Sequence, residues 1–221
     1  MKVQPPLTKN HEKERLKFAK DHITFGDKWQ DVVFSDEKKF NLDGPDGFRY
    51  YWHDIRKESS YFSKRQFSGG SVMIWGGFAA NGTTPIAYVK AKSNSEDYQD
   101  ILAEKLLPEA PLITSGEYIF QQDNASIHNS SSTKSWFEAN NVKVLKWPSR
   151  SPDLNPTENL WGILVREIYG NGKFYNTKEE LKMAIETSWK NLPKDTLKCL
   201  STSMTSRMIK LIEKKGNFLD Y

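Results

Sequence analysis

Residues 31–42 read Asp-Val-Val-Phe-Ser-Asp-Glu-Lys-Lys-Phe-Asn-Leu, a stretch in which every second side chain is largely apolar. This period of two predicts a β-strand whose even-numbered residues share one buried face. Asp36 lies on that face, whereas Glu37 points to the opposite one. A buried carboxylate is costly unless it is paired or bound to a metal ion. Asp36 is therefore a candidate metal ligand, or it pairs with Lys38 or Lys39 or lies in solvent at a strand end.

The rest of the pattern places strands and helices in an order typical of an α/β protein. We expect strands at residues 48–52, 71–80, 85–89, 117–122 and 142–147, the first of which pairs as a hairpin with residues 31–42 across the turn at residues 43–47. We expect helices at residues 9–30, 94–109, 130–140, 156–169, 177–192 and 194–215. Strands come first and then alternate with helices, so the sequence predicts an α/β core with a mixed sheet.

A second acid, Asp123, follows the strand expected at residues 117–122 and begins a loop that leads into a helix. Loops at the carboxyl ends of strands are the usual place for functional sites in α/β proteins. The pair Asp123-Asn124 also favours a turn in which the side chain binds its own backbone. The residues alone leave both interpretations open.

The third acid, Glu158, lies at the start of a predicted helix. Asn155, Pro156 and Glu158 have the spacing of a helix cap, in which the glutamate reaches back to the first residue, and capping alone would explain it. A first-turn glutamate is also rigidly held, which suits a metal ligand. Asp153 lies in the proline-bounded loop before the helix, and we interpret it as a structural residue.

Together, Asp36, Asp123 and Glu158 supply carboxylates from two strands and a helix. Oxygen-only sites of this kind are suited to hard divalent cations. Two such ions support the cleavage and transfer of phosphodiesters. The three acids therefore indicate a metal-dependent enzyme that acts on nucleic acid.

Size and composition favour one large globular domain over two small ones, since the chain has 221 residues and a mass of 25.5 kDa. No apolar run approaches the roughly 18 residues that span a bilayer, and the first residues lack the apolar region of a secretory signal. The lone Cys199 excludes an internal disulfide, and four scattered histidines offer no zinc-ligand spacing. A reducing intracellular compartment fits best.

The net charge of +4 is unevenly distributed. Residues 1–30 carry seven Lys or Arg against four Asp or Glu, residues 31–170 carry fifteen against eighteen, and residues 171–221 carry ten against six. An acidic middle between basic ends is consistent with metal-binding acids in a protein that binds a polyanion, although solvated helix faces give the same balance. Charge thus permits a nucleic-acid partner without requiring one.

Three segments together resemble the Tc/mariner superfamily of DNA transposases, and the nematode Tc-type members more than mariner proper. The matching segments are Phe34-Ser35-Asp36-Glu37, Gln121-Gln122-Asp123-Asn124-Ala125 with His128, and Ser151-Pro152-Asp153-Leu154-Asn155-Pro156 with Glu158-Asn159-Leu160-Trp161. The 34 residues between Asp123 and Glu158 are also typical of Tc-type enzymes, whereas mariner proper has an aspartate as its third acid. The resemblance runs from about residue 11 to residue 221.

This resemblance implies an α/β fold of the RNase H-like (retroviral integrase-like) type, with a five-stranded mixed sheet flanked by helices. It implies that Asp36, Asp123 and Glu158 bind two Mg²⁺ ions, for which Mn²⁺ can substitute. Family members cut transposon ends free and join the 3′-hydroxyl to a TA target dinucleotide. The implied partners are DNA, as inverted-repeat ends and TA target, and a second copy of the chain in the full-length complex. No membrane is implied, and the implied location is the nucleus.

The resemblance also divides the chain. We expect residues 1–30 to form a linker and helix before the core, and residues 31–221 to form the catalytic domain, with a clamp-like insertion around residues 44–70 and C-terminal helices at 177–215. The resemblance implies that full-length relatives carry two N-terminal helix-turn-helix domains, which we do not expect in this chain. Either the chain is a catalytic-domain fragment or the gene has lost its DNA-reading half, and in both cases we expect weak, largely sequence-independent DNA binding. The candidate contacts to DNA or to a partner are Arg56, Lys57, Lys64 and Arg65 in the insertion, with Asn124 and His128 near Asp123. Asn124 and His128 either support the metal site or hold a DNA phosphate. An exposed basic loop and loop-stabilising residues are the alternatives.

Three hypotheses follow from these patterns. The first is an active Mg²⁺-dependent transposase domain that cleaves DNA and transfers strands. The second is a truncated or domesticated transposase that acts as a DNA-binding or interaction module without activity. The third is an RNase H-like nuclease of another kind, acting on hybrids or junctions, which the Ser-Pro-Asp-Leu-Asn-Pro stretch disfavours.

Overall fold

The strand expected at residues 31–42 is present and lies at the centre of the sheet. The computed structural model describes residues 6–45 and 70–220 of the chain. Its strands are β1 (Val32–Asn41), β2 (Ser71–Ala79), β3 (Gly82–Thr83), β4 (Ala87–Tyr88), β5 (Ile119–Gln121) and β6 (Lys143–Val144). β1 pairs antiparallel with β2 on one side and parallel with β5 on the other. β6 extends the sheet parallel to β5, and β3 and β4 pair antiparallel with β2. The predicted mixed sheet is confirmed.

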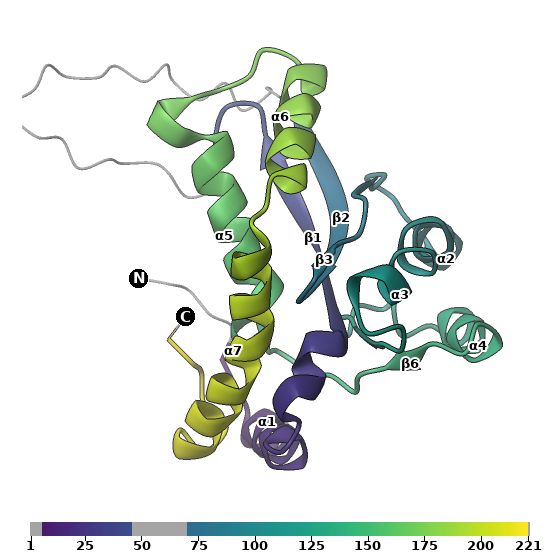
Figure 1. Ribbon diagram of the computed structural model, residues 1–221, viewed down its shortest axis with the longest axis vertical. Coiled ribbons are helices and arrows are strands. Elements are labelled where there is room, and N and C mark those ends of the chain that lie inside the picture. Colours follow the sequence, from purple (N-terminus) through teal and green to yellow (C-terminus); the bar gives the residue numbers. More distant parts are fainter. Residues whose placement is uncertain (1–5, 46–69, 221) are drawn as a thin grey trace, which may run out of the picture.

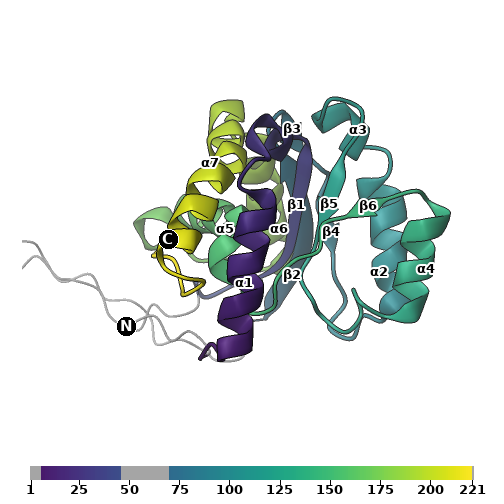
Figure 2. The ribbon, with the colours of Figure 1, turned by 90° about the horizontal axis from the view of Figure 1, so that it is seen from below.

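Helices cover both faces of this sheet (Figures 1 and 2). They are α1 (Lys9–His22), α2 (Ser95–Ile101), α3 (Ala110–Ile113), α4 (Ser131–Ala139), α5 (Pro156–Ile168), α6 (Lys178–Lys190) and α7 (Lys194–Glu213). α1, α5, α6 and α7 lie on one face, and α2, α3 and α4 lie on the other. Phe34 of β1 packs in the layer of α5 and α7, whereas its neighbour Val33 packs in the layer of α2 and α4. The alternation read from the sequence thus supplies both cores.

The first helix is shorter than expected. The pattern at residues 9–30 predicted one helix, but α1 ends at His22 and residues Gly26–Asp31 form a 3-10 helix. Gly26 has a φ of +53°, a left-handed conformation that a continuous right-handed helix cannot contain. The break brings Trp29 into the core, where its side chain is fully buried.

Other elements also differ from expectation. The helix expected at residues 94–109 consists of α2 followed by a π-helical turn at Leu102–Leu106. The strand expected at residues 142–147 is reduced to β6, and the one expected at 85–89 is reduced to β4. Proline has no N–H to donate to a sheet ladder, and Pro85 is the first residue of the strand expected at residues 85–89.

Some expectations fall on residues outside the described ranges. These are the hairpin strand at 48–52, most of the clamp-like insertion at 44–70, and the basic residues Arg56, Lys57, Lys64 and Arg65. Within the described ranges, no helix combines the length and apolar character that crossing a membrane requires.

Candidate active site

The pairing of β1 with β5 brings two of the three acids to the same part of the sheet. Phe34 of β1 lies opposite Gln121, the last residue of β5. Because the strands are parallel, the chain beyond Gln121 continues beside Ser35 and Asp36, and Asp123 follows two residues later. The Ser35 hydroxyl donates a hydrogen bond to the Gln121 carbonyl oxygen at 2.8 Å, which fixes this register.

The Asp36 carboxylate is held at both oxygens. Oδ1 accepts from the backbone N–H of Glu37 at 2.9 Å, and Oδ2 accepts from the indole Nε1 of Trp161 on α5 at 3.3 Å. Trp161 stacks on Trp189 of α6 with ring centroids 5.5 Å apart. Gly76 of β2 lies opposite Asp36 and makes room for this stack, since a Cβ there would lie 2.8 Å from the Trp189 ring. Two helices therefore fix the orientation of Asp36.

Asp123 is held by the loop that it begins. Its Oδ1 accepts from the backbone N–H of Ala125 at 2.9 Å and lies 2.6 Å from Nδ1 of His128. Burial alone raises the pKa of Asp123, but the hydrogen bonds from His128 and Ala125 outweigh it and lower the pKa below its usual value. The side chain is nevertheless 55% exposed. The turn considered from the sequence is present, and it leaves an ionised carboxylate accessible.

Glu158 lies in the first turn of α5 with an exposed side chain. The cap is supplied by Asn155, whose Oδ1 accepts from the Thr157 N–H at 3.1 Å and whose Nδ2 donates to the Ser35 carbonyl oxygen at 3.3 Å. Asn155 thereby ties the start of α5 to the residue that precedes Asp36. The expected N-cap at Asn155, followed by Pro156 in the first helical position, is confirmed, whereas the Glu158 side chain makes no hydrogen bond back to Asn155 among the described residues.

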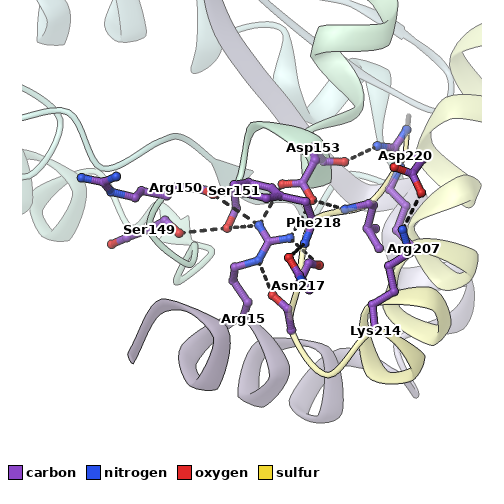
Figure 3. Close-up of polar contacts among 12 residues, drawn as sticks. Arg15, Ser149, Arg150, Ser151, Asp153, Arg207, Lys214, Asn217, Phe218 and Asp220 are labelled. Carbon is purple, nitrogen blue, oxygen red and sulfur yellow. Dashed lines mark hydrogen bonds and ion pairs between the residues drawn. The ribbon is translucent and has the colours of Figure 1, made fainter. Parts of the chain in front are cut away.

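A buried ion pair holds the loop that leads into α5 (Figure 3). Arg15 of α1 pairs with Asp153 through Nη1–Oδ1 at 2.8 Å and Nη2–Oδ2 at 2.6 Å, and both side chains are almost completely buried. The guanidinium also donates to the Ser151 hydroxyl at 2.8 Å and to the carbonyl oxygens of Gly216 and Asn217 at 2.8 and 3.2 Å. The interpretation of Asp153 as a structural residue is confirmed.

The same network reaches α7 and the segment that follows it (Figure 3). Asp153 Oδ2 accepts from the Leu219 N–H at 2.8 Å, and the Asp153 carbonyl oxygen accepts from Arg207 of α7 at 2.8 Å. Arg207 also donates to Asn159 of α5 at 2.6 Å. We call Arg15, Asp153 and Arg207 the loop anchor, because together they fix the loop from which Glu158 emerges.

The three acids line one pocket of about 430 Å³. Residues 147–152 form much of its wall, together with Asn124, Ala125 and Asn155. Asn124 donates to the Trp147 carbonyl oxygen at 2.9 Å and accepts from Asn129 at 3.1 Å. Asn124, a candidate DNA contact, therefore joins the Asp123 loop to this wall. His128, the other candidate, is only 4% exposed and offers little surface to DNA.

The electrostatics of the pocket favour a cation. Burial, followed by the charges of Glu158 and then Glu37, raises the pKa of Asp36 to about 8. None of the ion pairs among the described residues joins Asp36 to Lys38 or Lys39. In that part of the chain, no three His, Cys, Asp or Glu side chains are already gathered as ligands of one ion. The three carboxylates share a pocket and repel one another, and hard oxygen donors of this kind fit a divalent cation.

Sequence analysis missed the residues that support the acids. Trp161 is a buried core residue, as an apolar position of the helix expected at residues 156–169, but its indole also binds Asp36. Arg15 was not singled out because it lies among Lys and Glu residues. The available signal was its spacing, since Arg15, Phe18 and Ala19 follow the i, i+3, i+4 pattern of a buried helix face, and all three are buried.

Comparison with known proteins identifies a family. Residues 31–182 match the family described as DDE superfamily endonuclease. The transposable element Tc3 transposase of Caenorhabditis elegans is 48% identical over 221 residues, which cover 100% of this chain and 67% of the relative. This chain therefore spans about two thirds of the length of that relative.

Solved structures share the fold. The Mos1 transposase paired-end complex with left transposon end superposes with a TM-score of 0.83 and 19% identity, covering 100% of this chain and 66% of that chain. The Mos1 transposase catalytic domain with Raltegravir and Mg has a TM-score of 0.74 and 17% identity, covering 98% of this chain and 100% of that one. A structure of the same domain with Raltegravir and Mn gives the same TM-score. At these identities the similarity establishes the fold, which is the RNase H-like one expected from the sequence.

Proposed function

Since the chain belongs to the DDE superfamily of endonucleases and, within it, to the Tc-type transposases, we propose that its pocket cuts DNA at transposon ends and transfers the resulting 3′-hydroxyl to target DNA. One observation carries the proposal. Asp36, Asp123 and Glu158 come from a strand, a loop and a helix, yet they line a single pocket.

In this proposal the three carboxylates are metal ligands. Oxygen donors suit Mg²⁺, with Mn²⁺ as a substitute, and Mos1 structures that contain Mg or Mn support divalent metals in the family. When two such ions are bound, they supply an activated nucleophile and charge neutralisation at the leaving oxygen. Trp161 orients Asp36, the turn at Ala125 orients Asp123, and Asn155 orients the helix that carries Glu158. The protein itself contributes positioning, and it supplies the carboxylates that would hold the neutralising ions.

The proposed partners follow from the family. Two solved Mos1 structures are a paired-end complex with left transposon end and a strand transfer complex. By analogy, we assign transposon inverted-repeat ends and TA target DNA as substrates, a second copy of the chain as a partner, and the nucleus as the location.

Strand transfer from a precleaved transposon end tests the proposal, because the exposed 3′-hydroxyl bypasses the first cut. Asp36→Asn, Asp123→Asn and Glu158→Gln each remove one charge with little change of volume. We expect each to lower strand transfer in Mg²⁺ or Mn²⁺ by about 100-fold or more, the magnitude of losing one positioned electrostatic group. Glu179→Gln, on the exposed surface of α6, is the matched control and retains activity.

Two outcomes contradict the proposal. Activity retained by all three acid variants would place the reaction outside this pocket. Binding of the DNA end by the wild type, without strand transfer or cleavage in either metal, would favour a DNA-binding or interaction module without activity.

A further inference from the structure

The ring of His128 connects two acidic segments of the site. It lies between Asp123, which follows β5, and Glu37 of β1. Nδ1 is 2.6 Å from Asp123 Oδ1, and Nε2 is 3.4 Å from Glu37 Oε1. An ionised carboxylate only accepts hydrogen bonds, so the shorter contact requires a proton on Nδ1. His128 is thus a hydrogen-bond donor to Asp123.

Buried contacts hold this ring in place. Tyr98 of α2 packs on it with centroids 4.2 Å apart and planes inclined by 31°. The His128 carbonyl oxygen accepts from Gln122 Nε2 at 3.0 Å, and Gln122 Oε1 accepts from the Tyr98 hydroxyl at 2.8 Å. All three side chains are buried. Tyr98, Gln122 and His128 therefore form a closed set of contacts behind Asp123. These contacts fix the His128 ring, so the ring can fix the orientation of the Asp123 carboxylate.

The two oxygens of Asp123 differ in their surroundings. Oδ1 receives both the Ala125 N–H and His128 Nδ1. Oδ2 takes part in no hydrogen bond with the described residues, although the side chain lines the pocket. The contact with His128 therefore fixes the carboxylate through one oxygen and leaves the other available.

We propose that His128 is a positioning residue for Asp123, which fixes the carboxylate through Oδ1 so that Oδ2 is the oxygen that binds a divalent cation. This inference rests on the proposed function, in which Asp123 is a metal ligand. Hydrogen-bonding partners of metal ligands typically contribute 10- to 100-fold in metal affinity. Tyr98 and Gln122 contribute indirectly by holding the ring.

Two substitutions separate the roles of the two ring nitrogens. In His128→Asn the amide nitrogen takes the place of Nδ1, so the donor to Asp123 is kept. In His128→Gln the amide nitrogen takes the place of Nε2, so that donor is lost. In calorimetric titration of Mn²⁺ alone into the chain, we expect His128→Asn to bind within about 3-fold of the wild type and His128→Gln to bind about 10- to 100-fold more weakly.

The matched control is His11→Gln, because His11 lies on α1 and does not line the pocket. We expect this substitution to leave Mn²⁺ affinity unchanged. Urea unfolding of both His128 variants measures the purely structural effect, which we expect to be similar for the two. Imidazole ¹⁵N NMR with a chelator present gives a readout without metal. We expect a proton on Nδ1 in the wild type, and a shift of its resonance in Asp123→Asn.

The possible outcomes distinguish a failure of this inference from a failure of the proposed function. Any one of three results overturns the inference and leaves the proposed function intact. These are equal Mn²⁺ affinity in His128→Gln and the wild type, equal losses of affinity in both His128 variants, and an unprotonated Nδ1 in the wild type. Equal Mn²⁺ affinity in the wild type and Asp123→Asn removes Asp123 as a ligand, which overturns the inference and the proposed function together.

Discussion

The Asp36 carboxyl has a pKa of about 8, because burial and the charge of Glu158 both oppose its ionisation. A group whose pKa is higher in the folded chain than in the unfolded chain stabilises the fold at low pH, and this stabilisation is lost as the pH rises through the folded value. For Asp36 the pH window in which this stabilisation is lost runs from about pH 4 to about pH 8. Burial lowers the pKa of His128, but Asp123 and Glu37 raise it to about 9, so its window runs from about pH 6.5 to about pH 9.

We therefore expect the metal-free protein to lose stability as the pH rises from about 4 to about 9. The loss is at most about 1.4 kcal/mol per pH unit for each of these two groups. The lowered pKa of Asp123 acts in the opposite sense, and only below about pH 4. Urea unfolding with a chelator at several pH values measures this slope. A free energy of unfolding that increases across the range contradicts it.

Trp161 allows the hydrogen bond to Asp36 to be removed without removing the ring. Trp161→Phe deletes the Nε1 donor, which lies 3.3 Å from Oδ2, and keeps an aromatic ring on Trp189. We expect a loss of at least about 1 kcal/mol in the free energy of unfolding, because the substitution removes one hydrogen bond and part of a buried ring. In an Asp36→Ala background, which has no acceptor for the indole N–H, the same substitution is expected to cost less, because the hydrogen bond is already absent. Equal costs in both backgrounds would show that Trp161 contributes packing alone.

At the scale of elements, the packing of β2 against α6 depends on Gly76. A methyl group there would lie 2.8 Å from the Trp189 ring, so Gly76→Ala is expected to destabilise the protein by about 1–3 kcal/mol, the usual effect of overpacking. Gly162 of α5 is the matched control, because its nearest neighbour is a flexible Arg166 side chain at 3.9 Å. Gly162→Ala is expected to be neutral or to stabilise the helix by up to about 1 kcal/mol. Thermal unfolding of both variants compares them, and equal shifts contradict the argument.

The sequence predicted helices and strands correctly where neighbouring residues alone determine them. β1 follows from its own alternation, and the start of α5 follows from Asn155-Pro156. The break after α1 was not predicted, because only the backbone conformation of Gly26 decides it and the residues around it remain compatible with a helix. The local setting made each of the three acids a candidate, the resemblance of their segments to a family identified them together, and they line one pocket. Their supports were not identified, since Arg15 and Asp153 are 138 residues apart in sequence.

At the scale of the whole molecule, the loop anchor joins α1, the loop before α5, and α7. Arg15→Met leaves Asp153 as an unpaired buried carboxylate, and breaking such a pair typically costs about 3–5 kcal/mol. We expect Arg15→Met combined with Asp153→Leu to cost less than the sum of the single substitutions, because no unpaired charge remains. Urea unfolding of the three variants measures this coupling, and strictly additive costs contradict it.

The loop anchor also predicts which backbone segment loses protection from hydrogen exchange when Arg15 is replaced. In Arg15→Met, hydrogen exchange is expected to accelerate in residues 149–155, which Arg15 contacts directly, while β1 keeps its protection until global unfolding. Lys9→Met, at the exposed start of the same helix, is the matched control. Exchange that accelerates equally in β1 and in residues 149–155 would show that the substitution acts on the whole fold only.

The contacts from Arg15 to the Gly216 carbonyl and from Leu219 to Asp153 also set an order of events during synthesis. A nascent chain that has reached α6 already contains all three acids together with Arg15 and Asp153. It still lacks Arg207 and residues 216–219, which complete the contacts of the loop before Glu158. Domains generally acquire their tertiary contacts as the needed segments leave the ribosome. The loop before Glu158 therefore gains its full set of contacts only after residues 216–219 have emerged, although every acid of the pocket is synthesised earlier.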